Sequence, residues 1–307
     1  MMPKPKMPDF LKPGDLVALV CPASFVRGEL EDAHRLLSAW GLRVQVGKTV
    51  HAQYFQYAGS DELRAVDLQS VLDDPEIKAV FAARGGYGTV RIIDQINFSQ
   101  FVAKPKWLIG FSDITVLHSH IHACFGIPTI HGQMPVTIPD ATIPSLETLK
   151  KALFGEPISY QYKTADVLVK YNRNGVGSGV LIGGNLALLH SVMGSVSEMD
   201  FTNKVLVIED VGEQYYNIDR MLWTLKRANK LSQLAGLLVG GFTSMKDSPE
   251  VPFGSEVPEI VLEKIKDFNY PVAFDFPSGH IPNNHALIFG LPVQLSVENA
   301  QVGVVYI

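Results

Sequence analysis

Short apolar runs alternate with stretches of helical periodicity through the first half of the chain. The predicted strands, rich in β-branched and aromatic residues, are 15–22, 43–46, 78–83 and 107–111. The predicted helices are 29–41, one that begins at 60, 89–96, 114–125 and 142–155. Strands that alternate with helices are typical of a mostly parallel sheet with right-handed crossovers.

The second half of the chain shows the same alternation but ends in strands. Its predicted elements are strands at 179–184, 204–210 and 235–240, helices at 218–230 and 256–268, and closing strands at 272–275, 286–289 and 302–306. The polar stretch between the halves predicts a linker at 156–178. We therefore expect an α/β protein of two domains: 1–155 with a parallel sheet of flavodoxin or Rossmann type, and a strand-rich α/β domain at 179–307.

The composition narrows the class of protein. Of the 307 residues, 47% are hydrophobic and 19% charged, which excludes a disordered chain. The net charge of −5 comes without a basic stripe, so nucleic acid is not an expected partner. The first ten residues lack the apolar run of a signal peptide, and no stretch reaches the roughly 18 apolar residues of a membrane span. A cytoplasmic protein with no membrane partner is expected, its Cys21 and Cys124 reduced.

Ser112 lies where the strand 107–111 turns into the helix 114–125. Such a turn projects a hydroxyl above the sheet, and the next backbone N–H can point at a developing oxyanion. The segment Gly110-Phe111-Ser112-Asp113-Ile114 lacks the second glycine of the Gly-x-Ser-x-Gly elbow. A hydrolase nucleophile and a plain N-cap serine are both open interpretations.

A glycine-rich turn, Arg84-Gly85-Gly86-Tyr87-Gly88, follows another strand at the edge where open α/β sheets bind ligands. Its glycines allow close backbone approach, so one of its N–H groups is a candidate oxyanion donor. The spacing does not match a dinucleotide fingerprint. The alternative is a tight turn without a ligand.

A serine nucleophile needs a base, and the base needs an orienting acid. Glu209 ends a predicted strand and is the first candidate acid, with Asp210 and Glu213 as rivals. His280, in a loop between two strands, is a candidate base, and His285 is its rival.

Two groups of potential metal ligands, three histidines and an acidic segment, lack the spacing of known metal sites. His118 and His122 are four residues apart on a predicted helix, with His120 between them, but the Glu of a His-Glu-x-x-His motif is missing. The segment 209–213 lacks the alternating acids of a calcium loop. We expect neither a metal nor a cofactor.

Five segments in the same order resemble the LD-carboxypeptidase family of serine peptidases, which also contains microcin-immunity hydrolases. The resemblance runs from about Pro13 to the C-terminus. The segments are 84–88, 109–113, 183–186, 208–213 together with 218–222, and 278–280.

The resemblance implies a catalytic triad of Ser112 as nucleophile, Glu209 as acid and His280 as base. It implies an oxyanion hole formed by the backbone N–H groups of Gly86 and Asp113. The neighbours Arg84, Gly85 and Tyr87 are then expected to contact the substrate, with Arg84 as a candidate carboxylate partner.

The resemblance also implies a substrate. The expected reaction releases the terminal D-alanine of a murein tetrapeptide in cytosolic cell-wall recycling, by an enzyme that forms a homodimer. A second reading within the family is a hydrolase of a peptidyl- or aminoacyl-nucleotide antibiotic. A third, from another class, is a non-catalytic small-molecule binding protein.

Overall fold

The computed structural model describes residues 6–307, which divide into two compact units. One unit comprises residues up to Pro157 together with Pro282–Phe289, and the other comprises Ile158–Ile281 with Gly290–Ile307. The second unit therefore begins before the end of the expected linker, 156–178, which contains strand β6 and the start of β7. The return of 282–289 to the first unit was not expected from the sequence.

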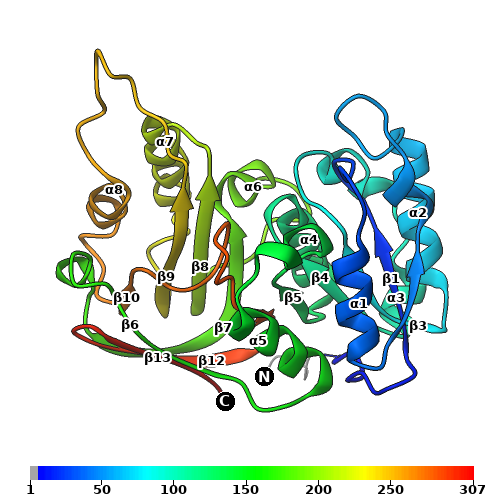
Figure 1. The fold of residues 1–307 in the computed structure, drawn as a ribbon. Helices are drawn as coiled ribbons and strands as arrows, with labels where there is room; N and C mark the ends of the chain where they lie inside the picture. The colour runs from blue at the N-terminus through cyan, green and yellow to red at the C-terminus, as the bar shows by residue number, and fades with distance from the viewer. Residues whose placement is uncertain (1–5) are drawn as a thin grey trace. The chain divides into compact units, whose positions relative to one another are not determined.

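The first unit contains a six-stranded sheet of order β11-β5-β4-β3-β1-β2 (Figure 1). Its strands are β1 (Leu16–Val20), β2 (Arg43–Val46), β3 (Ile77–Ala82), β4 (Trp107–Gly110), β5 (Thr129–His131) and β11 (Leu287–Phe289). All neighbours are parallel except β11, which pairs antiparallel with β5. The order 2-1-3-4-5 is that of flavodoxin, so the expected fold class is confirmed.

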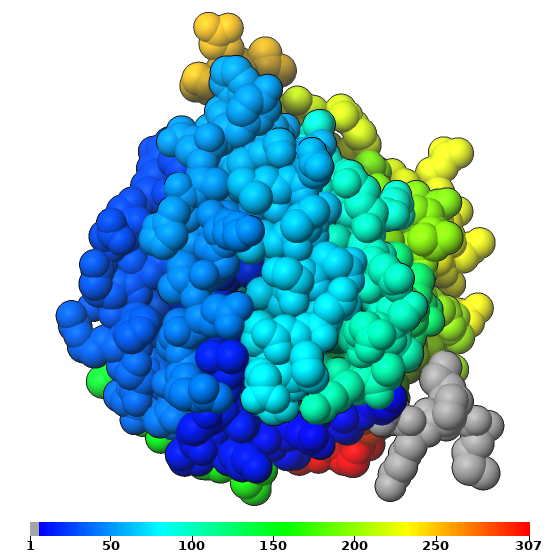
Figure 2. Space-filling view, turned by 90° about the vertical axis from the view of Figure 1, so that its right-hand side faces the viewer, coloured from blue at the N-terminus to red at the C-terminus, as the bar shows by residue number. Residues whose placement is uncertain are grey.

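Helices cover both faces of this sheet because β1 leads to β2 on one side and the chain then crosses back to β3 on the other. The helices are α1 (Glu31–Ala39), α2 (Asp61–Asp73), α3 (Ser99–Ala103), α4 (Thr115–Phe125) and α5 (Ile143–Phe154). Figure 2 looks onto the surface formed by α2, α3 and neighbouring segments, drawn in light blue to cyan. Caps set two of the helix starts: Ser60 accepts from Leu63 N and Thr142 from Ser145 N.

The predicted helix at 89–96 is wrong. The structure has two short 3₁₀ turns there, η2 (Thr89–Arg91) and η3 (Ile93–Gln95). Most of residues 89–93 are β-branched, which disfavours a regular helix. The N–H of Thr89 also donates to the Asp113 side chain, which anchors the start of this segment.

The second unit contains a seven-stranded sheet of order β10-β9-β8-β7-β12-β13-β6. Its strands are β6 (Ser159–Lys163), β7 (Gly175–Asn185), β8 (Lys204–Val211), β9 (Gly236–Thr243), β10 (Val272–Ala273), β12 (Pro292–Glu298) and β13 (Gln301–Tyr306). The strands β7 to β10 are parallel, and β12, β13 and β6 add an antiparallel extension.

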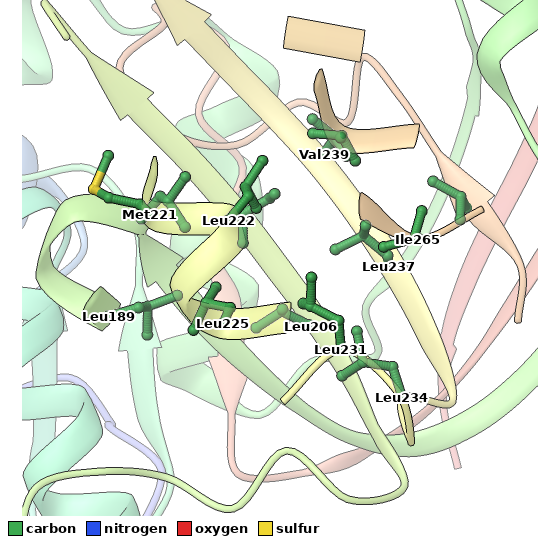
Figure 3. Close-up of a cluster of buried hydrophobic side chains, with 14 of the residues drawn as sticks. Leu189, Leu206, Met221, Leu222, Leu225, Leu231, Leu234, Leu237, Val239 and Ile265 are labelled. Atoms are coloured by element: carbon green, nitrogen blue, oxygen red, sulfur yellow. The ribbon is translucent and has the colours of Figure 1, made fainter. Parts of the chain in front are cut away.

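Helices α6 (Leu186–Ser191), α7 (Tyr215–Arg227) and α8 (Val257–Lys264) cover one face of the parallel part. The apolar residues of α7, Ile218, Met221, Leu222 and Leu225, recur at the spacing of one helix face. They pack with strand and loop side chains in a buried cluster (Figure 3). Burying each such side chain contributes about 1.5–3 kcal/mol, so this cluster stabilises the packing of the helices on β8 and β9.

Candidate active site

Ser112 adopts a strained backbone conformation between β4 and α4. Its φ is +64°, in the left-handed region that non-glycine residues rarely occupy. The residue belongs to a 3₁₀ turn, η4 (Ser112–Ile114), and the N-cap residues of η4 and α4 are Phe111 and Ile114. Ser112 therefore caps neither helix, and its turn has the geometry of a nucleophile elbow.

The missing second glycine of the elbow motif has a structural explanation. A Cβ at Gly110 would lie 2.9 Å from Ile114 Cγ1, so the Ile114 side chain packs directly against the first glycine. Gly110 thus allows Ile114 to approach the strand closely. His118, buried in α4, supports the turn from below, because its Nε2 lies 2.9 Å from Gly110 O and its Nδ1 2.8 Å from Thr129 Oγ1.

The glycine-rich turn lies directly against Ser112. A Cβ at Gly85 would lie 2.9 Å from Ser112 Cβ and 3.1 Å from its Oγ. Gly86 has a φ of +101°, and a side chain there would overlap Ser24 Oγ. This turn follows β3, next to β1, at the point where the strand order reverses and doubly wound sheets bind ligands.

Ser24, which the sequence did not single out, clamps the glycine turn. Its N–H donates to Gly85 O at 3.1 Å, and its Oγ accepts from Tyr87 N at 3.2 Å. Within residues 6–307, neither the Gly86 N–H nor the Asp113 N–H donates to a protein acceptor. Two unused backbone donors beside a strained serine are what an oxyanion hole requires.

The other two expected substrate contacts lie at the rim of this turn. Arg84 is half-buried, donates from Nη1 to Phe25 O at 2.6 Å, and stacks over the Phe25 ring. Tyr87 is 45% exposed, with its ring 6.1 Å from that of Tyr57.

In the second unit, Glu209 and His280 form a close pair. His280 Nδ1 lies 2.6 Å from Glu209 Oε2, and the Glu209 side chain is fully buried. A carboxylate oxygen can only accept, so Nδ1 carries the hydrogen and Nε2 is left as the basic nitrogen. This is the arrangement of an orienting acid with a general base.

The rivals for acid and base have other partners. Asp210 accepts from Asn185 Nδ2 at 2.9 Å and from two backbone N–H groups, and burial with the nearby Glu209 charge raises its pKa to about 6. Glu213 accepts from Asn217 at 3.0 Å. His285 lies in the first unit, 3.1 Å from Asn283 Oδ1. The structure brings together Glu209 and His280 and neither His285 nor the other two acids.

Glycine 279 makes the Glu209–His280 contact possible. Its φ is +106°, and a Cβ there would lie 2.6 Å from Glu209 Cβ and 2.7 Å from Oε2. We expect Gly279→Ala to lower kcat about 100-fold and the free energy of unfolding by about 1–3 kcal/mol, because the loop must shift away from the acid.

Gly194→Ala is the matched control for Gly279→Ala. Gly194 lies in the same unit at a φ of +78° with nothing within 4 Å of an added Cβ, so it isolates backbone strain from contact. Steady-state kinetics and thermal unfolding measure both variants. Equal kcat values for Gly279→Ala and Gly194→Ala would show that Gly279 is not needed for the Glu209–His280 contact.

The histidines considered as metal ligands have other surroundings. Burial lowers the pKa of His118 to about 4, so it stays neutral between Thr129 and Gly110. In the described part of the chain, no group of three or more His, Cys, Asp or Glu side chains is arranged to hold a metal ion. Burial also raises the pKa of Cys21 to about 12, which makes this thiol unreactive.

None of the helices within residues 6–307 is long and apolar enough to cross a bilayer.

In the first unit, a strained serine beside two unused backbone donors is an arrangement typical of a serine hydrolase. In the second unit, a buried carboxylate paired with an imidazole is typical of the acid and base of such an enzyme. Family profiles agree: that of the LD-carboxypeptidase N-terminal domain matches residues 17–132, and that of the C-terminal domain matches 178–295. The chain therefore belongs to the LD-carboxypeptidase family and is a serine carboxypeptidase, which excludes the non-catalytic binding protein.

Two curated relatives cover most of the chain. One, named probable murein peptide carboxypeptidase, from Bacillus subtilis, is 39% identical over 76% of this chain and 74% of its own. The murein tetrapeptide carboxypeptidase of Pseudomonas aeruginosa is 33% identical over 89% of this chain and 91% of its own.

Solved structures share the fold over nearly the whole chain. The muramoyltetrapeptide carboxypeptidase of Oxalobacter formigenes superposes with a TM-score of 0.84 at 24% identity, covering 95% of this chain and 98% of that one. The microcin C7 self-immunity protein MccF, in complex with aspartyl sulfamoyl adenosine, gives 0.86 at 20% identity, covering 98% of both.

Proposed function

We propose that this enzyme releases the terminal D-alanine of murein tetrapeptides, in the recycling of cell-wall peptides in the cytosol. The observation that carries the reaction type is the strained Ser112 turn against Gly85, with unused N–H donors at Gly86 and Asp113. The substrate is supported by the relatives in Bacillus subtilis and Pseudomonas aeruginosa, whose names specify murein peptides.

In the proposed reaction, His280 Nε2 takes the proton of the Ser112 hydroxyl as Oγ attacks the scissile carbonyl carbon. The Gly86 and Asp113 N–H groups bind the resulting oxyanion, and Glu209 stabilises the imidazolium. His280 then gives the proton to the leaving amine, and D-alanine departs from an acyl-enzyme on Ser112. Water, deprotonated by His280, attacks the ester and frees the shortened peptide.

The proposal includes a homodimer that binds no nucleic acid and no membrane, with a small peptide as its partner. Size-exclusion chromatography with light scattering measures the mass in solution. A mass near twice the 33.7 kDa of the chain is expected, and a mass of one chain at micromolar concentration contradicts the dimer.

A second candidate function, hydrolysis of an aminoacyl-nucleotide antibiotic, is favoured by one observation. The exposed Tyr87 ring lies near Tyr57 beside the glycine turn, where a planar base could stack. The structural similarity to MccF supports the fold of this chain and does not by itself support the antibiotic as substrate. A purine stack at this place would make an aminoacyl sulfamoyl adenosine a tight ligand.

Purified enzyme incubated with equal concentrations of a murein tetrapeptide and of aspartyl sulfamoyl adenosine separates the two functions. Chromatography of the products measures both reactions in one tube. We expect D-alanine to appear and the nucleotide to remain intact. Preferential cleavage of the nucleotide would establish the immunity function instead.

A further inference from the structure

The two turns that carry the proposed oxyanion donors are joined by the side chain of Asp113. This residue directly follows Ser112 and is fully buried. Its Oδ2 accepts from the backbone N–H of Thr89 at 2.8 Å, at the end of the glycine turn. Its own backbone N faces that turn, because a Cβ at Gly85 would lie 3.4 Å from it. Asp113 thus offers one proposed oxyanion donor through its backbone N–H, and its side chain binds the segment that carries the other donor, Gly86 N–H.

A buried arginine also holds the same segment in place. Arg64 on α2 is fully buried, and its Nη1 donates to Gly88 O at 2.9 Å and to Pro22 O at 2.5 Å. Asp61 pairs with Arg64 Nη2 and with Arg91. The far end of the glycine turn is therefore held at Gly88 by a cation and at Thr89 by a carboxyl group.

An oxyanion hole works only when both donors lie about 2.7–3.1 Å from one oxygen position. Here the donors come from different strand ends, those of β3 and β4, so their separation depends on whatever links the turns. Ser24 fixes the near end of the glycine turn but does not contact the nucleophile turn through any hydrogen bond within residues 6–307. The Asp113–Thr89 hydrogen bond links the two turns directly.

We infer that Asp113 is a positioning residue whose side chain, by accepting from Thr89 N, holds the Gly86 and Asp113 N–H groups in register on the oxyanion. The inference rests on the proposed function of Ser112 as nucleophile. It assigns to the Asp113 carboxyl a role separate from that of its backbone N–H.

The surroundings of the carboxyl agree with this role. Burial raises the pKa of Asp113, against the opposing effects of Thr89 and Arg64, and Oδ1 has no hydrogen-bond partner in the described part of the chain. An asparagine has the same shape and keeps an acceptor oxygen, so it reproduces the tie without a charge.

Three variants test the inference by kinetics. Asp113→Ala and Asp113→Leu remove the hydrogen bond to Thr89 N; leucine keeps the branched outline of aspartate but is larger and has no acceptor. We expect each to lower kcat for D-alanine release about 10- to 100-fold while KM changes less than about threefold, since the hole matters most in the transition state. Asp113→Asn keeps kcat within about threefold.

The matched control is Asp67→Ala in the same unit. Asp67 is also a buried aspartate, and it holds Lys48 N and Thr49 N at 3.0 and 2.9 Å, away from the nucleophile turn. We expect the Asp67→Ala variant to lose thermal stability, as Asp113→Ala does, but to keep kcat within about threefold of the wild type. Wild-type kcat in a folded Asp113→Ala or Asp113→Leu would overturn the inference. So would a large loss in Asp113→Asn, or failure of both truncations to fold, which would assign the side chain to the fold alone.

A second readout separates this inference from the proposed substrate. The rate at which a fluorophosphonate probe labels Ser112 also depends on the oxyanion hole but requires no murein peptide. If the wild type releases no D-alanine yet the variants label in the expected order, the substrate is wrong and the positioning role stands. If D-alanine is released but all variants label and turn over alike, the positioning role is wrong.

Discussion

Replacing Ser112 with alanine is expected to lower kcat for D-alanine release by at least about 10⁴-fold. In the proposed mechanism, the substitution removes the attacking oxygen and leaves only substrate binding and the backbone donors of Gly86 and Asp113 to accelerate the reaction. A coupled D-amino acid oxidase assay measures the rate, and intact-protein mass spectrometry measures acyl-enzyme after rapid quenching. We expect a transient mass increase on the wild-type enzyme and none on Ser112→Ala.

Ser119→Ala is the control for that prediction. Ser119 lies seven residues further along, in α4, is fully buried, and its Oγ has no partner within residues 6–307. Its loss should leave kcat within about twofold. Residual activity of Ser112→Ala within tenfold of the wild type would show that another group carries the acyl chain.

Glu209→Gln is expected to lower kcat about 10³- to 10⁴-fold with a small change in KM. The buried Glu209 carboxylate lies 2.6 Å from His280 Nδ1, and in the proposed mechanism it stabilises the imidazolium that forms when His280 accepts the proton of Ser112. Glutamine keeps the shape but removes the charge. Steady-state kinetics on the tetrapeptide measures the effect.

The rival acid supplies the comparison. Glu213→Gln removes a charge four residues away, on a side chain that accepts from Asn217. We expect this variant to keep kcat within about fivefold. A large loss of kcat in Glu213→Gln together with a small loss in Glu209→Gln would show that Glu213, and not Glu209, is the orienting acid.

Local patterns predicted most of the parallel strands and the capped helices. The strand at 43–46 and the helix start after Ser60 agree with the structure because β-branched content and capping act over a few residues. Strand β12 was not predicted, although apolar and polar residues alternate strictly along 293–298 in the way typical of a half-buried strand. Strand β11 pairs with β5 across more than 150 residues, and no local pattern encodes such a return.

The candidate site was predictable in part. The resemblance named Ser112, Glu209 and His280, whereas the residues themselves left Asp210, Glu213 and His285 open. The elbow motif could not establish the Ser112 turn, because its second glycine is replaced and the packing of Ile114 on Gly110 is a tertiary contact. Ser24 and Arg64 escaped notice because their importance comes from strand order, which brings the ends of β1 and β3 together.

The most direct test of the central claim is the release of alanine from two tetrapeptides that differ only in the configuration of the last residue. We predict that the wild-type enzyme releases D-alanine at least about 100-fold faster than L-alanine, since a shaped site discriminates through the transition state, and that Ser112→Ala releases neither. Equal release of L-alanine, or undiminished release of D-alanine by Ser112→Ala, would contradict it.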